Sequence, residues 1–455
     1  MSTMGLIHTI SDTDPNDWQY LSEGGATLVL SYRGAPDARF DGMVLRLKKI
    51  ALCSPNDHSN EDHSERSSTI ISDRRNNKGE DEDEDSSVSS IQCHNRIIRR
   101  LIPDRYLPRL SLIGTDPAWL SQLADLIQPS RPVLRRKKDA IDISAVQAIL
   151  ATDLTANESW SLEIKPKWGF LPSSTHLSPD TKAIKTRTCR YCMHSYLKSR
   201  NGEAAAVTFC PLDLYSGQEE RVANALGALW DEWHGKAGHI NNLKVFVGGK
   251  TLQAHDPASM VSLRHAMTNS SPSCTPSEKV DLRELFVTQL TAVLLSSRVL
   301  GIISELQRTL DPLDIEGLCS LWANRCADVS GDVLPTGPEP TLDDYEALIE
   351  RYLTNRKSQD HDHPDVQNVW YYTMMSLLSG TFKDCSIIIR PTFFNSGAGS
   401  DEGQPNSGPE PVTIIDLDRK PIKKLRHWAK LDKEIIDAYR SSGLNKRCVD
   451  EARDV

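Results

Sequence analysis

The segment 54–90 most constrains the fold of this chain, because it cannot contribute to a hydrophobic core. It holds eleven acidic and four basic residues, so it carries −7 of the chain's formal charge of −9. Large apolar side chains are almost absent, and burial therefore cannot offset the entropy of ordering the backbone. We expect a disordered acidic insertion within an otherwise folded lobe, and further surface loops at 269–278 and 395–411.

The remaining chain has the composition of a globular protein. It is 455 residues long with 38% apolar and 25% charged residues, which suffices for two or three packed units. The N-terminus has neither the basic nor the apolar part of a signal peptide, and the most apolar stretch, 285–306, is interrupted by polar residues. The ten scattered cysteines indicate reduced thiols rather than a disulfide framework. We expect a monomer of the cytoplasm or nucleus that requires neither a membrane nor nucleic acid.

The hydrophobic pattern changes from sheet-like to helical along the chain. Residues 27–32 and 43–50 are short β-prone runs on either side of a Gly-Pro turn, which predicts a small antiparallel sheet. Apolar residues recur every three or four positions at 219–233, 282–310 and 342–355, which predicts three helices. The second half is therefore predicted to be helix-rich with a few embedded strands.

Two features near the N-terminus are suited to binding phosphate. Gly24, Gly25 and Ala26 precede an apolar strand, and glycines let backbone N–H groups approach phosphate oxygens closely. A tight turn before a strand explains the same residues. Arg46 is a single cation within a second apolar strand, where it could clamp a phosphate or lie on the surface.

A charged stretch at 163–167 is a further candidate site. In an extended segment Glu163, Lys165 and Lys167 project from one face, because side chains alternate along a strand. Two ammonium groups and a carboxylate would then line one surface. A solvated edge strand could show the same pattern.

Basic residues also gather in three runs that contain no acid, at 131–138, 182–200 and 419–430. In a chain with an acidic balance, they suggest a site for a polyanion, although a solvated charged face explains any one of them. Pro421 is suited to the first turn of a helix, and Lys420, Lys424 and Trp428 then fall on one helix face.

Carboxylates beside buried apolar runs are candidates for a metal site or a catalytic base. Asp384 precedes one such run, and Asp416 follows another. Carboxylates make poor core residues and good Mg²⁺ ligands, whereas turn caps at strand ends are the alternative. Cys189 and Cys192, with His194 and Cys210, also suggest zinc, but the second closely spaced pair of ligands is missing, so we expect no zinc site.

Taken together, seven segments resemble the inositol-pentakisphosphate 2-kinase family in order and spacing over nearly the whole chain. They are the runs from Glu23 to Leu30, Glu163 to Pro172, Cys189 to His194, Cys210 to Gly217, Leu313 to Gly317, Lys383 to Ile387 and Asp416 to Pro421.

The resemblance implies an α+β, two-lobed fold that is distantly similar to protein kinases. A small, mainly antiparallel N-terminal lobe would span residues 1–158 and bind the nucleotide, and a larger helix-rich lobe would span 159–455 and bind the inositol phosphate. The implied reaction uses ATP and Mg²⁺ to phosphorylate the 2-hydroxyl of inositol 1,3,4,5,6-pentakisphosphate. The product would be inositol hexakisphosphate.

The resemblance also implies roles for individual residues. Asp384 would be the base, Lys165 would lie near the transferred phosphoryl group, and Asp416 would hold Mg²⁺. The nucleotide would contact Gly24, Gly25, Ala26, Arg46, Asp153, Glu163 and Asp416. The substrate phosphates would contact Arg135, Lys165, Lys167, Asn242, Lys420, Lys424 and Trp428.

Three positions depart from the family's pattern. Cys192 stands where some members carry lysine, Lys424 replaces an arginine, and Trp428 replaces a tyrosine. The last two changes lose a bidentate fork and a hydroxyl group, which alters individual substrate contacts. A non-catalytic scaffold that binds inositol polyphosphates is the alternative function. Nucleic-acid binding is a third hypothesis, and no recognised binding motif in the sequence supports it.

Overall fold

The chain folds into two compact units, each built around its own antiparallel sheet. The computed structural model describes residues 9–52, 86–155, 159–203, 208–236, 238, 240–269, 281–326, 334–355, 358–391 and 410–451. Residues 54–85 of the predicted insertion, and 270–278 and 395–409 of the predicted loops, lie outside the described residues. The prediction of disorder is wrong for 86–90, because these residues form the start of the helix Ser86–Cys93. The first unit comprises Met1–Gln92 and Arg109–Asp153, and the second comprises Cys93–Pro108 and Leu154–Val455.

The sheet of the first unit has the strand order β1-β2-β3-β6-β4, and β5 pairs with β3. Its elements are β1 (Trp18–Glu23), β2 (Thr27–Tyr32), β3 (Met43–Ala51), α1 (Ser86–Cys93), β4 (Leu110–Gly114), α3 (Pro117–Ile127), α4 (Val133–Arg136), β5 (Asp139–Ile141) and β6 (Gln147–Thr152). Both strands predicted near the N-terminus are confirmed, and the sheet is antiparallel as expected.

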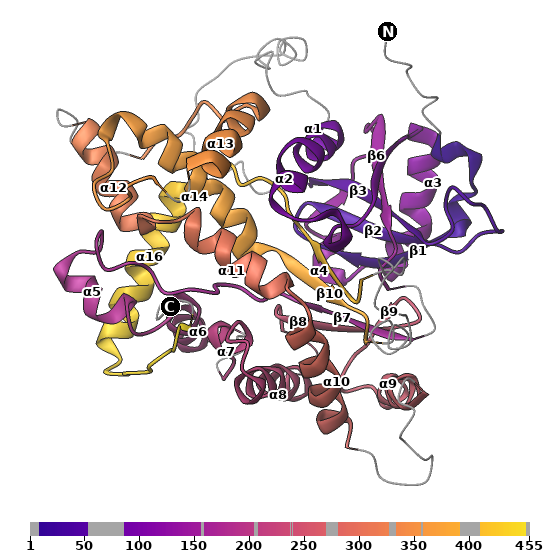
Figure 1. Ribbon diagram of the computed structural model, residues 1–455. Helices are drawn as coiled ribbons and strands as arrows, with labels where there is room; N and C mark the ends of the chain where they lie inside the picture. The colour runs from indigo at the N-terminus through magenta and orange to yellow at the C-terminus, as the bar shows by residue number, and fades with distance from the viewer. Residues whose placement is uncertain are drawn as a thin grey trace, which may run out of the picture. The chain divides into compact units, whose positions relative to one another are not determined.

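The core of the first unit forms on one face of this sheet. Leu28 and Leu30 of β2 are completely buried, and they belong to the same apolar cluster as Trp119 and Leu123 of α3. Trp119 and Leu123 lie four positions apart and therefore project from the same side of the helix. Figure 1 shows α3 packed along this sheet.

A buried group of four charged side chains fixes the turn between β1 and β2. Lys49 and Arg131 each form ion pairs with Glu23 and Asp139, and all four side chains are at most 7% exposed. The Lys49 ammonium also donates a hydrogen bond to the carbonyl of Gly24 at 2.8 Å. Paired charges of this kind are a condition for burying them, so Arg131 has a structural role in the first unit.

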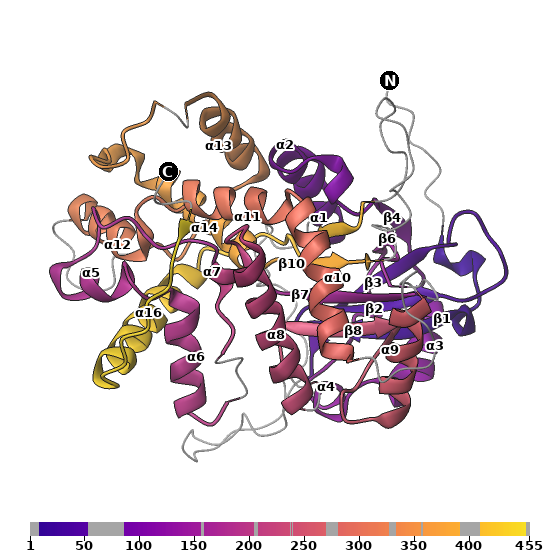
Figure 2. The same ribbon diagram turned by 60° about the horizontal axis from the view of Figure 1, so that its bottom comes forward.

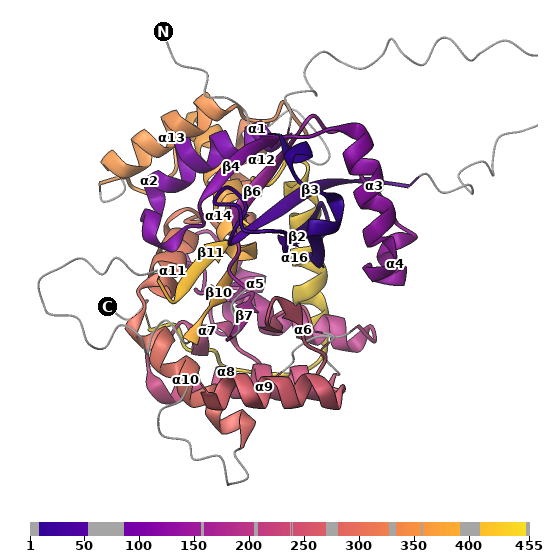
Figure 3. The ribbon, with the colours of Figure 1, turned by 90° about the vertical axis from the view of Figure 1, so that its right-hand side faces the viewer.

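The sheet of the second unit has the order β11-β10-β7-β8-β9. Its strands are β7 (Trp160–Ile164), β8 (Leu243–Val247), β9 (Lys250–Thr251), β10 (Ser386–Ile389) and β11 (Val412–Ile415). Ile387 pairs with Ile164, and Ser386 pairs with Ile415. Because these pairs are antiparallel, the end of β7, the start of β10 and the end of β11 meet at one edge of the sheet (Figure 3).

Helices cover the sheet of the second unit and extend away from it (Figures 1 and 2). In chain order they are α2 (Arg99–Leu101), α5 (Pro179–Lys185), α6 (Arg190–Arg200), α7 (Pro211–Leu214), α8 (Glu219–Gly235), α9 (Pro257–Asn269), α10 (Leu282–Ser296), α11 (Val299–Thr309), α12 (Asp314–Arg325), α13 (Leu342–Asn355), α14 (Val369–Asp384) and α16 (Lys424–Ser441). The helices predicted at 219–233 and 342–355 are confirmed.

The prediction of one continuous helix over 282–310 is wrong. The segment forms α10 and α11, and the helical path bends by 63° between them. The backbone of Ser297 is extended at ψ 137°, and its hydroxyl accepts a hydrogen bond from the N–H of Val299 at 3.2 Å. A serine that bonds to nearby backbone in this way competes with the helix. Among the described residues, no single helix meets the length and hydropathy of a membrane span, and only the bent pair of Leu282–Ser296 with Val299–Arg325 does so together.

The segment 93–108 packs with the second unit, although the predicted lobe boundary placed it in the first. Ile97 and Ile98 are buried in the large apolar cluster of the second unit. The guanidinium group of Arg96 also donates to both carboxylate oxygens of Glu346 on α13, at 2.8 and 2.7 Å. Apolar burial and a bidentate ion pair together attach this segment to α13.

Candidate active site

The edge where β7, β10 and β11 meet brings predicted site residues of three distant segments together. Asp384 is the last residue of α14 and lies just before β10, whereas Asp416 follows β11. Lys165 follows β7, and its ammonium lies 3.4 Å from Oδ2 of Asp416. The antiparallel register explains this convergence, because it places the start of one strand beside the ends of its two neighbours.

Backbone strain marks the same edge. Lys167 and Asp416 have φ values of 62° and 60°, and Asp314 is the only other non-glycine residue with a positive φ among those described. This left-handed conformation is costly for residues with a Cβ and persists where surrounding contacts impose it. Such strain often accompanies functional sites. It also interrupts the simple alternation predicted for Glu163, Lys165 and Lys167.

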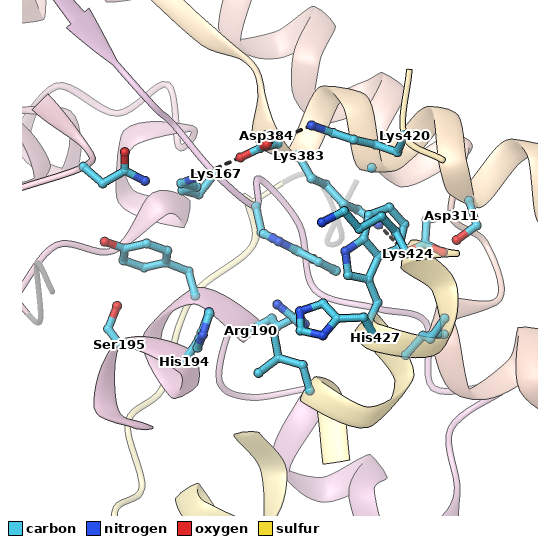
Figure 4. Close-up of a pocket in the computed structure, with 18 of the residues that line it drawn as sticks. Lys167, Arg190, His194, Ser195, Asp311, Lys383, Asp384, Lys420, Lys424 and His427 are labelled. Atoms are coloured by element: carbon cyan, nitrogen blue, oxygen red, sulfur yellow. Dashed lines mark hydrogen bonds and ion pairs between the residues drawn. The ribbon is translucent and has the colours of Figure 1, made fainter. Parts of the chain in front are cut away.

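Asp384 lies between two ammonium groups (Figure 4). Its Oδ1 accepts from Lys167 at 3.2 Å, and its Oδ2 accepts from Lys420 at 2.8 Å. Burial alone would raise the pKa of Asp384, but the nearby charges of Lys167, Lys420 and Lys165 outweigh it and lower the pKa to about 2. The carboxylate is therefore ionised at neutral pH and can accept a hydrogen bond from a substrate hydroxyl.

The pocket beside Asp384 is a cavity of about 370 Å³ with a strongly basic lining. Six lysine or arginine residues line it, against two aspartates that are both already in ion pairs. The lining comprises Lys167, Trp168, Arg190, Tyr191, His194, Ser195, Lys198, Asn241, Asn242, Asp311, Ile315, Ser376, Gly380, Lys383, Asp384, Lys420, Lys424, His427, Trp428 and Leu431. A cavity of this charge is suited to a small polyanion.

Helix α6 supplies one wall of the pocket with residues that were not assigned to the site from sequence. Arg190, His194 and Lys198 recur every four positions, so they share one helix face, and all three line the cavity. Figure 4 shows Arg190 and His194 on this face. Burial and the charges of Arg190, Lys198 and Lys167 lower the pKa of His194 to about 4, so its imidazole is neutral at pH 7. The four-residue spacing of these residues within the basic run 182–200 could have indicated from the sequence that they share a helix face.

Helix α16 also contributes residues to the lining of the pocket, but the helix begins later than predicted. Pro421 lies in a turn before the helix, and the N–H of Lys424 donates to the carbonyl of Pro421. Lys420 therefore reaches the cavity from the preceding loop rather than from the same helix face. Lys424 and Trp428 do share a face of α16, as predicted, and His427 joins them there.

Trp168 lines the pocket and packs against two of its cations. Its indole ring lies 4.1 Å from the ammonium of Lys383 and 5.0 Å from the guanidinium carbon of Arg190. Lys383 is also paired with Asp311, and both side chains are at most 8% exposed. Cation–π contacts and a buried ion pair thus hold these side chains in place.

Gly380 of α14 allows Trp428 to lie against the helix. A Cβ at this position would meet the Cη2 atom of Trp428 at 2.5 Å. Replacing Gly380 with alanine should displace Trp428 into the pocket and raise KM for the bound polyanion roughly ten-fold, a cost of about 1.4 kcal/mol. Steady-state kinetics would measure this, with Gly301→Ala on α11 as the control, since a Cβ there meets nothing within 4 Å. An unchanged KM in the first variant would contradict the role of Trp428.

Asn242 and Glu163, both predicted site residues, are buried and bonded within the protein. The Asn242 amide donates to the carbonyl of Lys165 at 3.1 Å and accepts from the hydroxyl of Tyr191 at 2.9 Å. Glu163 accepts from Lys244 at 2.8 Å and from Ser386 at 2.9 Å. Asn242 also lines the cavity, whereas Glu163 is not among its lining residues.

The other predicted site residues belong to the first unit. Gly24, Gly25 and Ala26 form the turn between β1 and β2, and a Cβ at Gly25 would meet no atom within 4 Å. Arg46 pairs across the sheet with Val29 of the neighbouring strand. Asp153 follows β6 and accepts a hydrogen bond from Ser31, and Arg135 lies on the short helix α4.

Asp416 presents a partly exposed carboxylate at this edge. Its side chain is 39% exposed, and Oδ2 accepts from the Ser386 hydroxyl at 3.1 Å. An accessible carboxylate fits a metal that prefers oxygen ligands and retains several waters. Lys165 is retained as an ammonium beside it, because Asp416, Glu163 and Asp384 outweigh burial and raise the pKa of Lys165.

Four cysteines form a second group that could hold a metal. The Sγ atoms of Cys189, Cys192, Cys210 and Cys448 all lie within 4.8 Å of one another, and all four residues are buried. Sulfur atoms around a tetrahedral zinc ion are about 3.8 Å apart, given zinc–sulfur bonds of about 2.3 Å. The sequence predicted no zinc site because a second pair of ligands was missing near Cys189 and Cys192. In the fold, Cys448 lies beside Cys210, and together they supply that pair.

A third group, Asp314, Glu316 and Asp432, surrounds a buried lysine. The ammonium of Lys185 lies 2.5 Å from Asp314, 3.1 Å from Glu316 and 2.9 Å from Asp432, and its side chain is 2% exposed. Burial would lower the pKa of Lys185, but Asp314 and Asp432 outweigh it and raise the pKa. The Lys185 ammonium thus lies among these carboxylates and joins α5, α12 and α16.

Comparison with known proteins places this arrangement in a family. The sequence profile described as inositol-pentakisphosphate 2-kinase matches residues 20–434. The protein named inositol-pentakisphosphate 2-kinase in Cryptococcus neoformans is 29% identical over 439 residues, which cover 93% of this chain and 94% of that protein. Its namesakes in Arabidopsis thaliana and Danio rerio are each 26% identical, and each alignment covers 94% of this chain with 94% and 93% of the relative. The chain therefore belongs to the inositol-pentakisphosphate 2-kinase family, and it is a kinase.

Proposed function

We propose that this kinase transfers the γ-phosphoryl group of ATP to the 2-hydroxyl of inositol 1,3,4,5,6-pentakisphosphate, giving ADP and inositol hexakisphosphate. The main support for this proposal is the basic cavity, in which Asp384 lies between Lys167 and Lys420. The two units would act as the nucleotide-binding and inositol phosphate-binding lobes of an enzyme distantly similar to protein kinases. The family membership and the names of the relatives support this assignment.

The charge of the cavity matches that of the proposed substrate. A pentakisphosphate carries roughly ten negative charges near neutral pH, at about two per phosphate. The six lysine and arginine side chains that line the cavity offset part of this charge, because Lys167, Lys420 and Lys383 are also paired with the two lining aspartates. Arg190 supplies a guanidinium group to the lining from α6.

The reaction requires one bond to form and one to break at the γ-phosphorus. The substrate oxygen forms the new bond, the bond to the β-phosphate oxygen breaks with its electron pair leaving on ADP, and the hydroxyl proton passes to Asp384. Because the pKa of Asp384 is lowered to about 2, this transfer accompanies bond formation rather than preceding it. Asp416 would hold Mg²⁺, which supplies charge neutralisation to the phosphates, and Lys165 would stabilise the phosphoryl oxygens.

We also propose that the four-cysteine group binds a structural zinc ion. The site offers four thiol ligands and leaves no position for a substrate, which is typical of structural zinc centres. Cys189 caps the N-terminus of α6, and Cys192 lies in its first turn. The metal would thereby fix the helix that presents Arg190 and His194 to the cavity.

The proposed reaction is tested by incubating the purified protein with Mg-ATP and inositol 1,3,4,5,6-pentakisphosphate. Phosphorus NMR and anion-exchange chromatography should show inositol hexakisphosphate appearing in equal amount to ADP. ADP formation without a new inositol phosphate would show that the protein only hydrolyses ATP. Binding of the pentakisphosphate with no ADP at all would favour the alternative, a non-catalytic scaffold for inositol polyphosphates.

A further inference from the structure

Gln307 is a buried polar residue to which the proposed reaction gives no role. It lies on α11 and is 0% exposed. A buried side-chain amide is costly unless its acceptor and its donors are all bonded. The partners of this amide show what the residue does.

The amide of Gln307 first fixes the segment that carries Lys167. Its Oε1 accepts from the N–H of Gly169 at 2.7 Å, and its Nε2 donates to the carbonyl of Lys167 at 2.8 Å. Tyr215 also donates to the Lys167 carbonyl, at 3.3 Å, and Ser304 donates to the carbonyl of Gly169 at 2.7 Å. Since Lys167 has a φ of 62°, these bonds hold a conformation that the residue would otherwise leave.

The same amide also fixes the end of α14. Its Nε2 donates to the carbonyl of Phe382 at 2.9 Å, two residues before Asp384. The last carbonyls of a helix have no partner within the helix, so an outside donor is needed here. Ser379 of α14 donates in turn to the backbone carbonyl of Gln307 at 2.8 Å. One side chain therefore joins the segment of Lys167 to the segment of Asp384.

We infer that Gln307 is a positioning residue that sets the contact between Lys167 and Asp384. This inference rests on the proposed function, because it assigns Gln307 a role through the proposed base and its lysine partner. Lys167 and Asp384 come from segments 217 residues apart, and their side chains meet at 3.2 Å.

A double-mutant cycle with Lys167 tests the inference. Gln307→Met should lower kcat roughly ten- to one hundred-fold, as expected for a misplacement of about 1 Å at the reacting centre. In a Lys167→Met background the same change should lower kcat less than about three-fold, because Lys167 is then no longer there to be positioned. Equal losses in both backgrounds would show a purely structural role and overturn the inference.

Two further variants separate positioning from loss of stability. Thr373→Val removes a buried hydroxyl that accepts from Trp322 at 2.9 Å, on the same helix as Asp384 but about three turns away. If Thr373→Val lowers the melting temperature as much as Gln307→Met does, it should still keep the wild-type kcat. If Gln307→Met does not fold, Tyr215→Phe removes the hydroxyl that donates to the Lys167 carbonyl and accepts from Nε2 of Gln307 at 3.4 Å, and the same cycle with Lys167→Met is run on it.

Calorimetric binding of inositol hexakisphosphate distinguishes failure of this inference from failure of the proposed function. Lys167 lines the cavity, so the affinity for the polyanion should fall several-fold in Gln307→Met and show the same non-additivity with Lys167→Met. If the wild-type protein transfers no phosphate, the proposed function fails while the binding cycle still decides the role of Gln307. Unchanged affinity together with unchanged kcat would refute the positioning role.

Discussion

Replacing Asp384 with asparagine is expected to lower kcat by a factor of about 10² to 10⁴, the range that a positioned general base contributes. Asparagine keeps the size of the side chain and can still face Lys167 and Lys420, but it cannot take the hydroxyl proton. The affinity for inositol hexakisphosphate should be retained or rise, because the two ammonium groups lose their internal carboxylate partner. Single-turnover kinetics and calorimetry would measure the two quantities separately.

Asp360 provides a matched control for this substitution. It is also an aspartate of the second unit, is 64% exposed, pairs with His363, and does not line the cavity. Asp360→Asn should leave kcat and polyanion affinity unchanged. If Asp384→Asn retained kcat within about three-fold of wild type, Asp384 would not be the base. A loss of affinity rather than of kcat would instead make Asp384 a residue that orders the lysines.

Removing one ligand of the four-cysteine group is expected to destabilise the second unit. Metal analysis of the purified protein should find about one zinc ion per chain, and Cys448→Ser should lose it. A structural zinc site contributes folding free energy comparable to the whole stability of a domain, which is about 5–15 kcal/mol. We therefore expect a large drop in melting temperature, and a strong chelator should reproduce it in the wild-type protein.

Cys326→Ser is the corresponding control, since Cys326 is half-buried at the end of α12 and lies outside the group. It should keep the zinc ion and the wild-type melting temperature. Purified protein with no zinc, and with a melting temperature insensitive to both Cys448→Ser and the chelator, would contradict a zinc centre. Detection of a disulfide between two of the four cysteines under native conditions would assign the group a redox role instead.

Local patterns in the sequence were sufficient for several elements. The β-prone run at 27–32 and the helical periodicity at 342–355 correspond to β2 and α13 with the same bounds. The periodicity at 342–355 places the apolar residues on one helix face, and burial of that face decides its structure. The break at Ser297 was missed because apolar residues continue on both sides of it, and only the backbone bond to Val299 shows that the helix ends there.

Long-range contacts account for what could not be predicted. Cys448 is 238 residues from Cys210, and no spacing rule links two such positions before the chain is folded. The same applies to Lys420, which reaches Asp384 from a loop although the helical pattern placed it on α16. By contrast, the spacing of Arg190, His194 and Lys198 was visible in the sequence, and their place in the pocket required only the direction of α6.

The position of Cys448 has a consequence for how the protein is made. The segment that follows α16 returns to the start of α6, where the N–H of Cys448 donates to the carbonyl of Arg187 at 2.8 Å. Two residues later, Asp450 accepts from the N–H of Leu171 at 2.7 Å and pairs with Arg308. During synthesis these contacts can form only after residue 450 has been added to the chain. A chain terminated before Cys448 would thus lack the bonds that tie this segment to Arg187, Leu171 and Arg308.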